Sequence, residues 1–364
     1  MSNQIGKQRL TVSEWLLMYA VITYAPTTRA LTQMTITNAK EMAWMVPVAS
    51  CIVYVPLMAI IVSIVKKFQG KSFIDIMSAC FGKTVSKILG VIIMVYLLVL
   101  LAMYIRYSTD QLTSTVYIGT DYRIFVFLEL FAIFFMLRGG IATIGRMNKI
   151  VFFLLIIQFL LLLVFLVKEL DINNVTPVHI GGIPNVLRST LDVLSISGYV
   201  TFLLIFNDKV VIYDKFKKGF VRIGIFMITA LTLIVFWTLS IFGWRIVEHL
   251  NYPFFQVVKG IIIFKGMTGM EALFLSLWLL SEFMIICFFS YCILHLAKGV
   301  FNIKSELPFI SVFLVFMFLF TQYFCSNTLE LQTFSRSIAF PTNIIITIVL
   351  PFMLFVVGKI RKKI

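Results

Sequence analysis

Residues 148–168 read NKIVFFLLIIQFLLLLVFLVK, and this stretch decides the fold class. Between its two lysines, Gln158 is the one polar residue. The run is about as long as the ~20 residues that a helix needs to cross a bilayer. It shows no alternation of apolar and polar residues, which predicts a membrane-spanning helix rather than a strand of a membrane barrel.

Similar apolar runs follow one another along the whole chain. They lie near residues 12–36, 43–65, 86–109, 122–138, 148–168, 187–207, 220–243, 271–297, 307–325 and 338–358. We therefore predict an all-α integral membrane protein, a single membrane domain over residues 1–364 with about ten transmembrane helices. The composition agrees, since 60% of the residues are hydrophobic and 13% charged, against about 25% charged in soluble domains. A soluble enzyme, a disordered chain and a disulfide scaffold are excluded.

The net charge of +15 reports orientation in the membrane. With the N-terminus inside, roughly two thirds of the 31 Lys and Arg residues fall in connections on the inner side, as the positive-inside rule requires. We predict that both termini are cytoplasmic. Nucleic acid is not needed to explain the charge, so no nucleic-acid partner is expected.

The residues that usually carry catalysis or metal binding are scattered. The five Cys form no CxxC pair, the three His stand singly, and no nucleotide-binding or metalloprotease motif is present. The sequence therefore predicts neither an enzyme, a metal site nor a cofactor.

Two predicted spans contain interruptions in corresponding places. The first reads TYAPTTR over residues 23–29, and the sixth reads DVLSISGY over residues 192–199. A long polar connection at 169–186 divides the chain into two halves of five spans, 11–168 and 187–358, which start on opposite sides of the membrane. This pattern is typical of an inverted-topology repeat, in which paired broken helices point to a ligand site at the membrane midplane. The alternative is a simple proline kink in one helix and a glycine packing contact in the other.

The candidate ligand pocket follows from these interruptions. From the first span it takes Thr23, Ala25, Pro26, Thr27 and Thr28, from the sixth Ser195, Ser197, Gly198 and Tyr199, and Tyr96 or Met103 and Glu282 complete its walls.

Charged residues inside spans are few, and each needs a partner or a cavity because burial of a charge in the membrane is costly. Arg29 could hold a ligand carboxylate, pair with Glu282, or extend toward the surface. Glu282 lies too deep to reach water, which favours a cavity. Arg106 and Asp110 are four residues apart on one helix face and predict a salt bridge. For Glu129 the sequence suggests no single role.

Several short motifs carry a resemblance to a known family. They are LTVSEW at 10–15, GKSF at 70–73, FGK at 81–83, RGGI at 138–141, NYPF at 251–254 and MEAL at 270–273. In this order and at this spacing they resemble the B subunit of bacterial spore germinant receptors, the endospore germination permease family. Two broken helices in a five-plus-five repeat are similar to the wider amino acid–polyamine–organocation transporter superfamily with its LeuT-like fold.

The resemblance implies a function. It predicts a subunit of the inner membrane of bacterial spores that senses a small germinant, usually an amino acid, with a germinant receptor A subunit and a lipoprotein C subunit as partners and membrane lipid around it. One alternative is an autonomous amino-acid permease coupled to H⁺ or Na⁺ through Glu282, and another is a scaffold subunit that binds no ligand. Many relatives carry an acidic residue after the interruption of the sixth span, where this chain has Tyr199, Val200 and Thr201.

Overall fold

The chain folds into a bundle of helices. The computed structural model describes residues 9–211, 216–250, 252–260, 270–325 and 327–363. The α-helices are α2 (Val12–Pro26), α3 (Thr32–Ala39), α4 (Val46–Ala49), α5 (Cys51–Lys67), α6 (Phe73–Phe81), α7 (Lys83–Thr115), α8 (Tyr122–Gly139), α9 (Ile141–Leu166), α10 (Ile183–Ser197), α11 (Phe216–Val247), α12 (Pro253–Lys259), α13 (Met270–Phe301), α14 (Ile310–Phe324), α15 (Thr328–Phe334), α16 (Phe340–Ile344) and α17 (Leu350–Ile360).

Tighter and wider helical turns interrupt or join the α-helices. The π-helical turns are η2 (Thr27–Leu31), η9 (Ser335–Ala339) and η10 (Ile345–Val349). The 3₁₀ segments are η3 (Lys40–Met45), η4 (Val167–Glu169), η5 (Ile172–Val175), η6 (Ile180–Gly182), η7 (Gly198–Lys209) and η8 (Leu307–Phe309). Of these, η4, η5 and η6 form the connection predicted at 169–186.

The helices are long and apolar enough for an integral membrane protein. In the described residues, 8 helical stretches satisfy length and composition for a membrane span, fewer than the ten runs in the sequence. The first stretch, Val12–Lys67, contains two of the predicted runs, and the chain turns between them at Lys40 (φ 48°). The short α8 is not among the 8 and carries Arg123, Glu129 and Arg138 in 18 residues. The count of ten stays a prediction.

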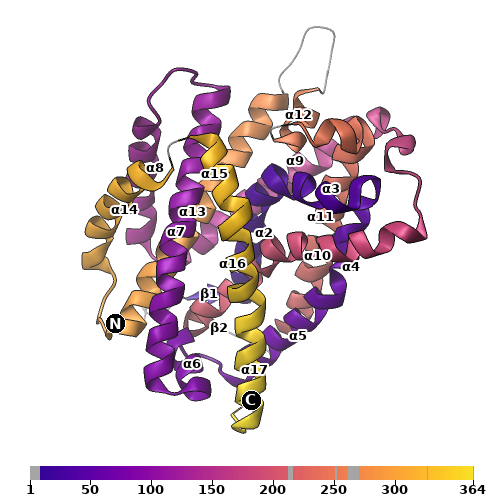
Figure 1. The fold of residues 1–364 in the computed structure, drawn as a ribbon. Helices are drawn as coiled ribbons and strands as arrows, with labels where there is room; N and C mark the ends of the chain where they lie inside the picture. The colour runs from indigo at the N-terminus through magenta and orange to yellow at the C-terminus, as the bar shows by residue number, and fades with distance from the viewer. Residues whose placement is uncertain (1–8, 212–215, 251, 261–269, 326, 364) are drawn as a thin grey trace.

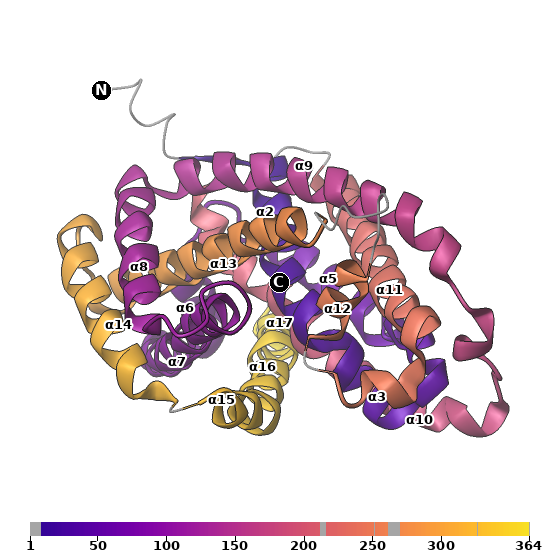
Figure 2. The same cartoon turned by 90° about the horizontal axis from the view of Figure 1, so that it is seen from above.

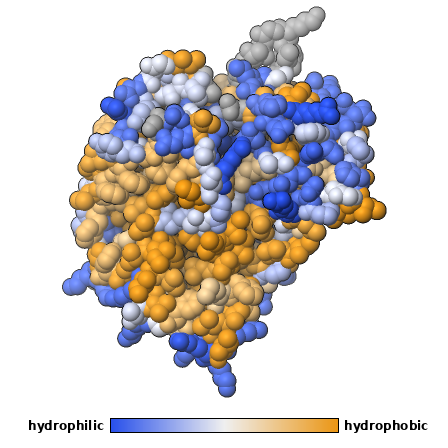
Figure 3. Space-filling view, viewed as in Figure 1, coloured by the Kyte–Doolittle hydropathy of each residue, from blue (hydrophilic) through white to orange (hydrophobic). Residues whose placement is uncertain are grey.

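The arrangement places α2, α13 and the segment η7 in the interior. The helix α13 packs against α7, α2, α8 and α9, and Figure 2 shows α9 running along one side of the bundle with α13 and α2 behind it. Apolar side chains form a broad belt between two hydrophilic ends (Figure 3). This distribution is what a bilayer around the helices requires.

The first and sixth predicted spans cross in opposite directions. The strand β1 (Leu10–Thr11), which leads into α2, pairs with β2 (Val210–Val211), which follows η7 (Figure 1). Further along, the Trp15 indole donates to the Leu203 carbonyl at 3.0 Å and the Tyr19 hydroxyl to the Ser197 carbonyl at 2.7 Å. Between these two hydrogen bonds residue numbers rise along α2 and fall along the sixth span, so these two segments are antiparallel. The short strands β1 and β2 themselves pair in parallel.

A polar cluster fixes the connection between α13 and α14. The two ring nitrogens of His295 lie 3.0 Å from a carboxylate oxygen of Asp208 and of Glu306, and the Lys298 ammonium lies 3.5 Å from Glu306. Burial alone would raise the pKa of Glu306, but the hydrogen bond with His295, its backbone hydrogen bond and the positive charges beside it outweigh burial and lower the pKa to about 2. The ionised carboxylate therefore ties α13, the end of η7 and the connection together.

We expect this cluster to make stability depend on pH in the acid range. A carboxyl group whose pKa is lowered on folding stabilises the protein above its unfolded pKa, and this contribution is lost as the pH falls toward the folded value. E306Q should therefore lower stability by up to about 3 kcal/mol at pH 7. The difference from wild type should shrink between about pH 4.5 and pH 2. Thermal unfolding of wild type and E306Q across this pH range measures the difference. A variant of an exposed carboxylate, Glu169→Gln, is the control. A difference that does not change with pH contradicts the expectation.

Candidate functional site

The first span changes its helical geometry where the sequence predicts an interruption. The helix α2 ends at Pro26, and the π-helical turn η2 follows before α3 continues. The hydroxyls of Thr27 and Thr28 donate to the carbonyls of Thr23 (2.6 Å) and Tyr24 (3.1 Å), one turn earlier. Single π-turns inside α-helices occur frequently at functional sites.

The sixth span changes at Gly198, where α10 gives way to the 3₁₀ segment η7. Two carbonyls at this junction are bound from other helices. The Asn343 amide of α16 donates to the Ser195 carbonyl at 3.0 Å, and Tyr19 of α2 donates to the Ser197 carbonyl. Side chains far away in sequence therefore hold the junction in addition to the backbone N–H of Gly198, which bonds to carbonyls of α10.

A buried ion pair joins η2 to α13. The Arg29 guanidinium donates to Glu282, and the two side chains are 6% and 0% exposed. The guanidinium also lies over the ring of Tyr107, 4.0 Å from the centroid, and 5.4 Å from the centroid of the Tyr104 ring. Among the described residues the second carboxylate oxygen of Glu282 has no hydrogen-bond partner. Of the three possibilities that the sequence leaves open for Arg29, the structure has the pair with Glu282.

A chain of hydroxyl and amide groups continues from this ion pair. The hydroxyls of Tyr104 and Tyr199 are hydrogen-bonded to each other, and the Asn343 amide donates to Tyr199 at 3.0 Å. The hydroxyl of Tyr96 in turn donates to the Asn343 carbonyl oxygen. Asn343 thus connects α7, α16 and the junction of the sixth span in one buried network.

Removing the Asn343 amide should loosen this network. In N343L the Ser195 carbonyl and the Tyr96 and Tyr199 hydroxyls lose a partner, and each buried polar group left unsatisfied costs about 1–3 kcal/mol. We expect a clear loss of thermal stability in detergent. N343D should cost at least as much as N343L, because the aspartate either buries an unpaired negative charge or has to bind a proton to stay neutral. Equal stability of N343L and wild type contradicts the role of the amide.

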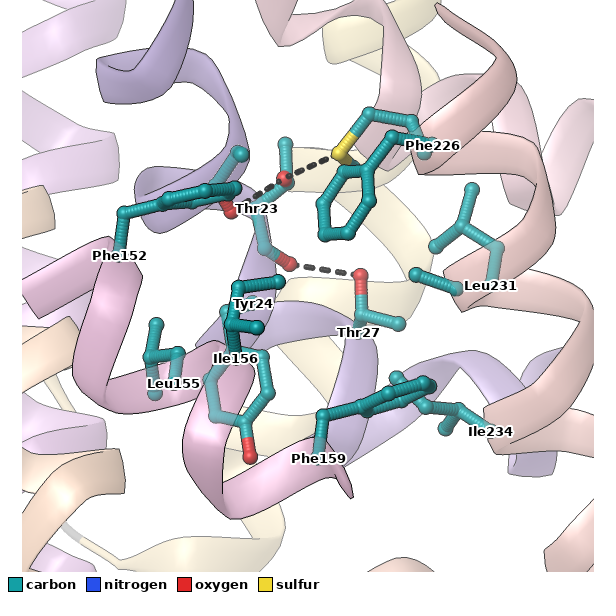
Figure 4. A pocket seen from close by; sticks show the side chains of 13 residues that line it. Thr23, Tyr24, Thr27, Phe152, Leu155, Ile156, Phe159, Phe226, Leu231 and Ile234 are labelled. Carbon is teal, nitrogen blue, oxygen red and sulfur yellow. Dashed lines mark hydrogen bonds between the residues drawn. The ribbon is translucent and has the colours of Figure 1, made fainter. Parts of the chain in front are cut away.

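The structure brings only part of the predicted pocket together. Arg29, Glu282, Tyr199, Tyr96 and the Ser195 carbonyl belong to the network just described. Thr23 and Thr27 instead line a cavity of about 40 Å³ between α2, α9 and α11, whose other walls are apolar. Figure 4 shows the Thr27 hydroxyl turned toward the Thr23 carbonyl and surrounded by aromatic side chains.

The remaining residues of the predicted pocket are engaged in helix packing or in hydrogen bonds within their own helix. Ala25 and Met103 are buried in apolar clusters. Thr28 satisfies carbonyls of its own helix, and Pro26 ends α2. Gly198 is in close contact with Thr347, because an added Cβ would lie 2.2 Å from the Thr347 hydroxyl oxygen. We regard their part in a ligand pocket as an open prediction.

The predicted salt bridge between Arg106 and Asp110 is wrong. Thr328 donates to one oxygen of Asp110 at 2.6 Å and Tyr252 to the other at 3.2 Å. The guanidinium of Arg106 stacks over the ring of Tyr122 at 3.9 Å. An ion pair between residues four apart on a helix is weak when the basic residue comes first. The hydrogen bonds that Asp110 accepts from the hydroxyls of Tyr252 and Thr328 therefore stabilise it more than a pair with Arg106 would.

Asp110 and Tyr252 stand at the floor of a large open cavity of about 1160 Å³ between the ends of α7, α12, α13 and α15. Burial raises the pKa of Tyr252, the neighbouring Asp110 carboxylate raises it further, and the positive charge of Arg29 opposes both. Tyr252 therefore lies within electrostatic reach of both Asp110 and Arg29.

Sequence reasoning missed several members of the network. Asn343 is an amide within an otherwise apolar predicted span, and that contrast is a usable signal. Tyr107 shares a helix face with Tyr96 and Met103, and a stripe of this kind is more typical of helix packing than of a ligand wall. Nothing in the sequence singles out Tyr104 or Tyr19 among the thirteen tyrosines, because tyrosine is common in membrane proteins as an anchor at the membrane interface.

A family model described as spore germination protein matches residues 11–329 of the chain. The chain belongs to this family. It is also similar to "Putative spore germination protein YfkT" of Bacillus subtilis (strain 168), with 22% identity over 328 residues that cover 89% of each chain. The spore germination family is transporter-like and non-enzymatic. This agrees with an integral membrane protein that has polar side chains buried inside its helix bundle. The predicted resemblance to the endospore germination permease family is thereby confirmed. The resemblance to the wider transporter superfamily with its LeuT-like fold stays a prediction.

Proposed function

We propose that the chain is a germinant-sensing, transporter-like subunit of a spore germination receptor and that it binds a small amino acid at Arg29 and Glu282. The observation that carries this proposal is the buried ion pair between η2 and α13. Burying two charges at membrane depth costs several kcal/mol, and well-packed apolar residues often serve stability as well or better. An intramembrane pair of this kind is therefore a functional site by default.

The chemistry of the pair suits a zwitterion. An amino acid carries one negative and one positive group, so its carboxylate can bind the Arg29 guanidinium in the forked geometry that guanidinium favours. Its ammonium can then take the place of Arg29 on Glu282, whose second oxygen is buried and without a partner among the described residues. Tyr107 and Tyr104 would flank the bound ligand.

Ligand binding at this place would act on both irregular segments. Arg29 belongs to η2, and the Tyr104–Tyr199–Asn343 network reaches the junction at Gly198. A ligand that fits one arrangement of these segments better than another shifts the population toward it. We infer that a germinant receptor A subunit and a lipoprotein C subunit would respond to this change in conformation.

The architecture that accompanies this proposal is a LeuT-like fold of ten spans with inverted repeats at 11–168 and 187–358. The antiparallel course of α2 and the sixth span supports it. The distribution of basic residues supports cytoplasmic termini, and membership of the spore germination family supports a place in the inner membrane of the spore.

A ligand panel on the purified full-length chain tests the site. We expect selected L-amino acids to raise the apparent melting temperature, because a ligand that binds the folded state stabilises it. Matched analogues separate the two contacts: an amine without the carboxylate and an acid without the ammonium should both fail. No stabilisation by any amino acid would favour the scaffold alternative and sink the proposal.

Transport is a second candidate, favoured by the Glu282 oxygen that has no hydrogen-bond partner among the described residues. A carboxyl group in that position could carry a proton, as an amino-acid permease coupled to H⁺ would need. Proteoliposomes that contain this chain alone decide between the two functions. A sensor binds labelled amino acid without accumulating it, whereas a permease accumulates it when a proton gradient is imposed and fails to do so as E282Q.

A further inference from the structure

A second polar cavity lies away from the ion pair, at the end of the bundle where α6 and the end of α17 also lie (Figure 1). It has a volume of about 220 Å³ and lies between the end of α8, the start of α9, α13 and the connection from α13 to α14. The RGGI motif at 138–141, which the proposed function does not use, forms one wall.

Positive charge dominates this cavity. Arg138, Lys209, Lys298 and Lys304 line it from four different segments, and Glu306 is the one carboxylate among its lining residues. Glu306 is itself engaged by His295 and Lys298. Within the described part of the chain, Lys298 is the one cation of the four with an ion-pair partner. The cavity therefore concentrates unneutralised cations in a confined space, which attracts anions.

The backbone adds to the positive potential. The 26-residue helix α9 starts at Ile141, and its N-cap residue Gly140 has no side chain that could cap it. The backbone N–H of Ile141 donates to the hydroxyl of Tyr291, which also lines the cavity. Gly140 precedes it with φ 76° and ψ 178°, and an added Cβ there would meet open space. The positive end of the α9 dipole thus opens on the cavity among the basic side chains, an arrangement suited to an anion.

We propose that this cavity binds a phosphate group, carried either by the headgroup of an anionic lipid or by a free phosphate ion. Phosphate fits the forked donors of Arg138, the point charges of the lysines and the helix terminus together. The cavity lies at the end of the spans, where lipid headgroups meet the protein, and basic pockets between helices on the cytoplasmic side recognise such headgroups. The site is separate from the Arg29–Glu282 pair and does not depend on amino-acid binding.

Binding to the purified full-length protein in neutral detergent tests the proposal by native mass spectrometry. The probes are phosphatidylglycerol, phosphatidylcholine and inorganic phosphate. We expect retention of phosphatidylglycerol, or of inorganic phosphate if the free ion is the ligand, and weak retention of phosphatidylcholine. In R138Q/K304Q the apparent affinity should fall about 25-fold, since each charge near an anionic headgroup is worth about a factor of five.

A matched control separates the cavity from general surface charge. K66Q/K67Q removes two exposed cations at the end of α5 that do not line the cavity, and should leave the affinity within about twofold of wild type. Loss of phosphatidylglycerol without loss of phosphate assigns the site to lipid, and the reverse assigns it to the free ion. Equal binding by R138Q/K304Q and K66Q/K67Q, or equal retention of both lipids with no phosphate bound, overturns the proposal.

Discussion

R29M is expected to lower the stability of the protein by about 3–5 kcal/mol, because it leaves the carboxylate of Glu282 buried without its counter-charge. E282M should have a similar effect, since it leaves the Arg29 guanidinium buried at 6% exposure. The double variant R29M/E282M removes both charges and should recover most of the loss, as apolar replacements of buried pairs often do. Thermal unfolding of the four proteins in one detergent measures the coupling.

The exposed pair of Arg123 and Asp121 provides a matched control. Its atoms are 3.9 Å apart and its side chains are 64% and 53% exposed, so R123M should cost less than about 1 kcal/mol. Additive losses in R29M/E282M would contradict a coupled pair. The double variant also separates stability from function, because a well-folded protein without either charge should no longer be stabilised by any amino acid.

The fold class could be predicted from the sequence because spans are local. A stretch such as 148–168 encodes its membrane crossing in its own composition, without reference to any other part of the chain. The boundary between the first two apolar runs is harder to predict, because the chain turns there through the positive φ of Lys40. At α8 the charges of Arg123, Glu129 and Arg138 dilute the apolar signal.

The site was predicted only in part, for a physical reason. Pro26 and Gly198 are visible in the sequence because they alter their own helix. The partners that fix the junction at Gly198, Asn343 and Tyr19, lie more than a hundred residues away from Ser195 and Ser197. The same limit explains Asp110, where the predicted neighbour Arg106 was four residues away and the actual donors are Tyr252 and Thr328. Long-range polar contacts carry no local pattern.

G198A is expected to destabilise the junction of the sixth span by at least about 1–3 kcal/mol through overpacking. The backbone of Gly198 has ordinary helical angles, φ −61° and ψ −14°, so alanine meets no conformational barrier there. Its Cβ would instead lie 2.2 Å from the hydroxyl oxygen and 2.8 Å from the Cβ of Thr347 in η10. Glycine is needed at this position because another helix approaches closely.

This explanation makes a graded prediction for second-site variants. In G198A/T347A the hydroxyl and methyl groups of residue 347 are gone but its Cβ contact remains, so stability should recover in part. G198A/T347G removes all of these contacts and should recover further relative to T347G alone. The control is Gly224, where an added Cβ meets nothing closer than 3.5 Å, so G224A should be neutral or stabilising by up to about 1 kcal/mol. If G198A is as well tolerated as G224A, close packing against η10 is not what keeps glycine at the junction.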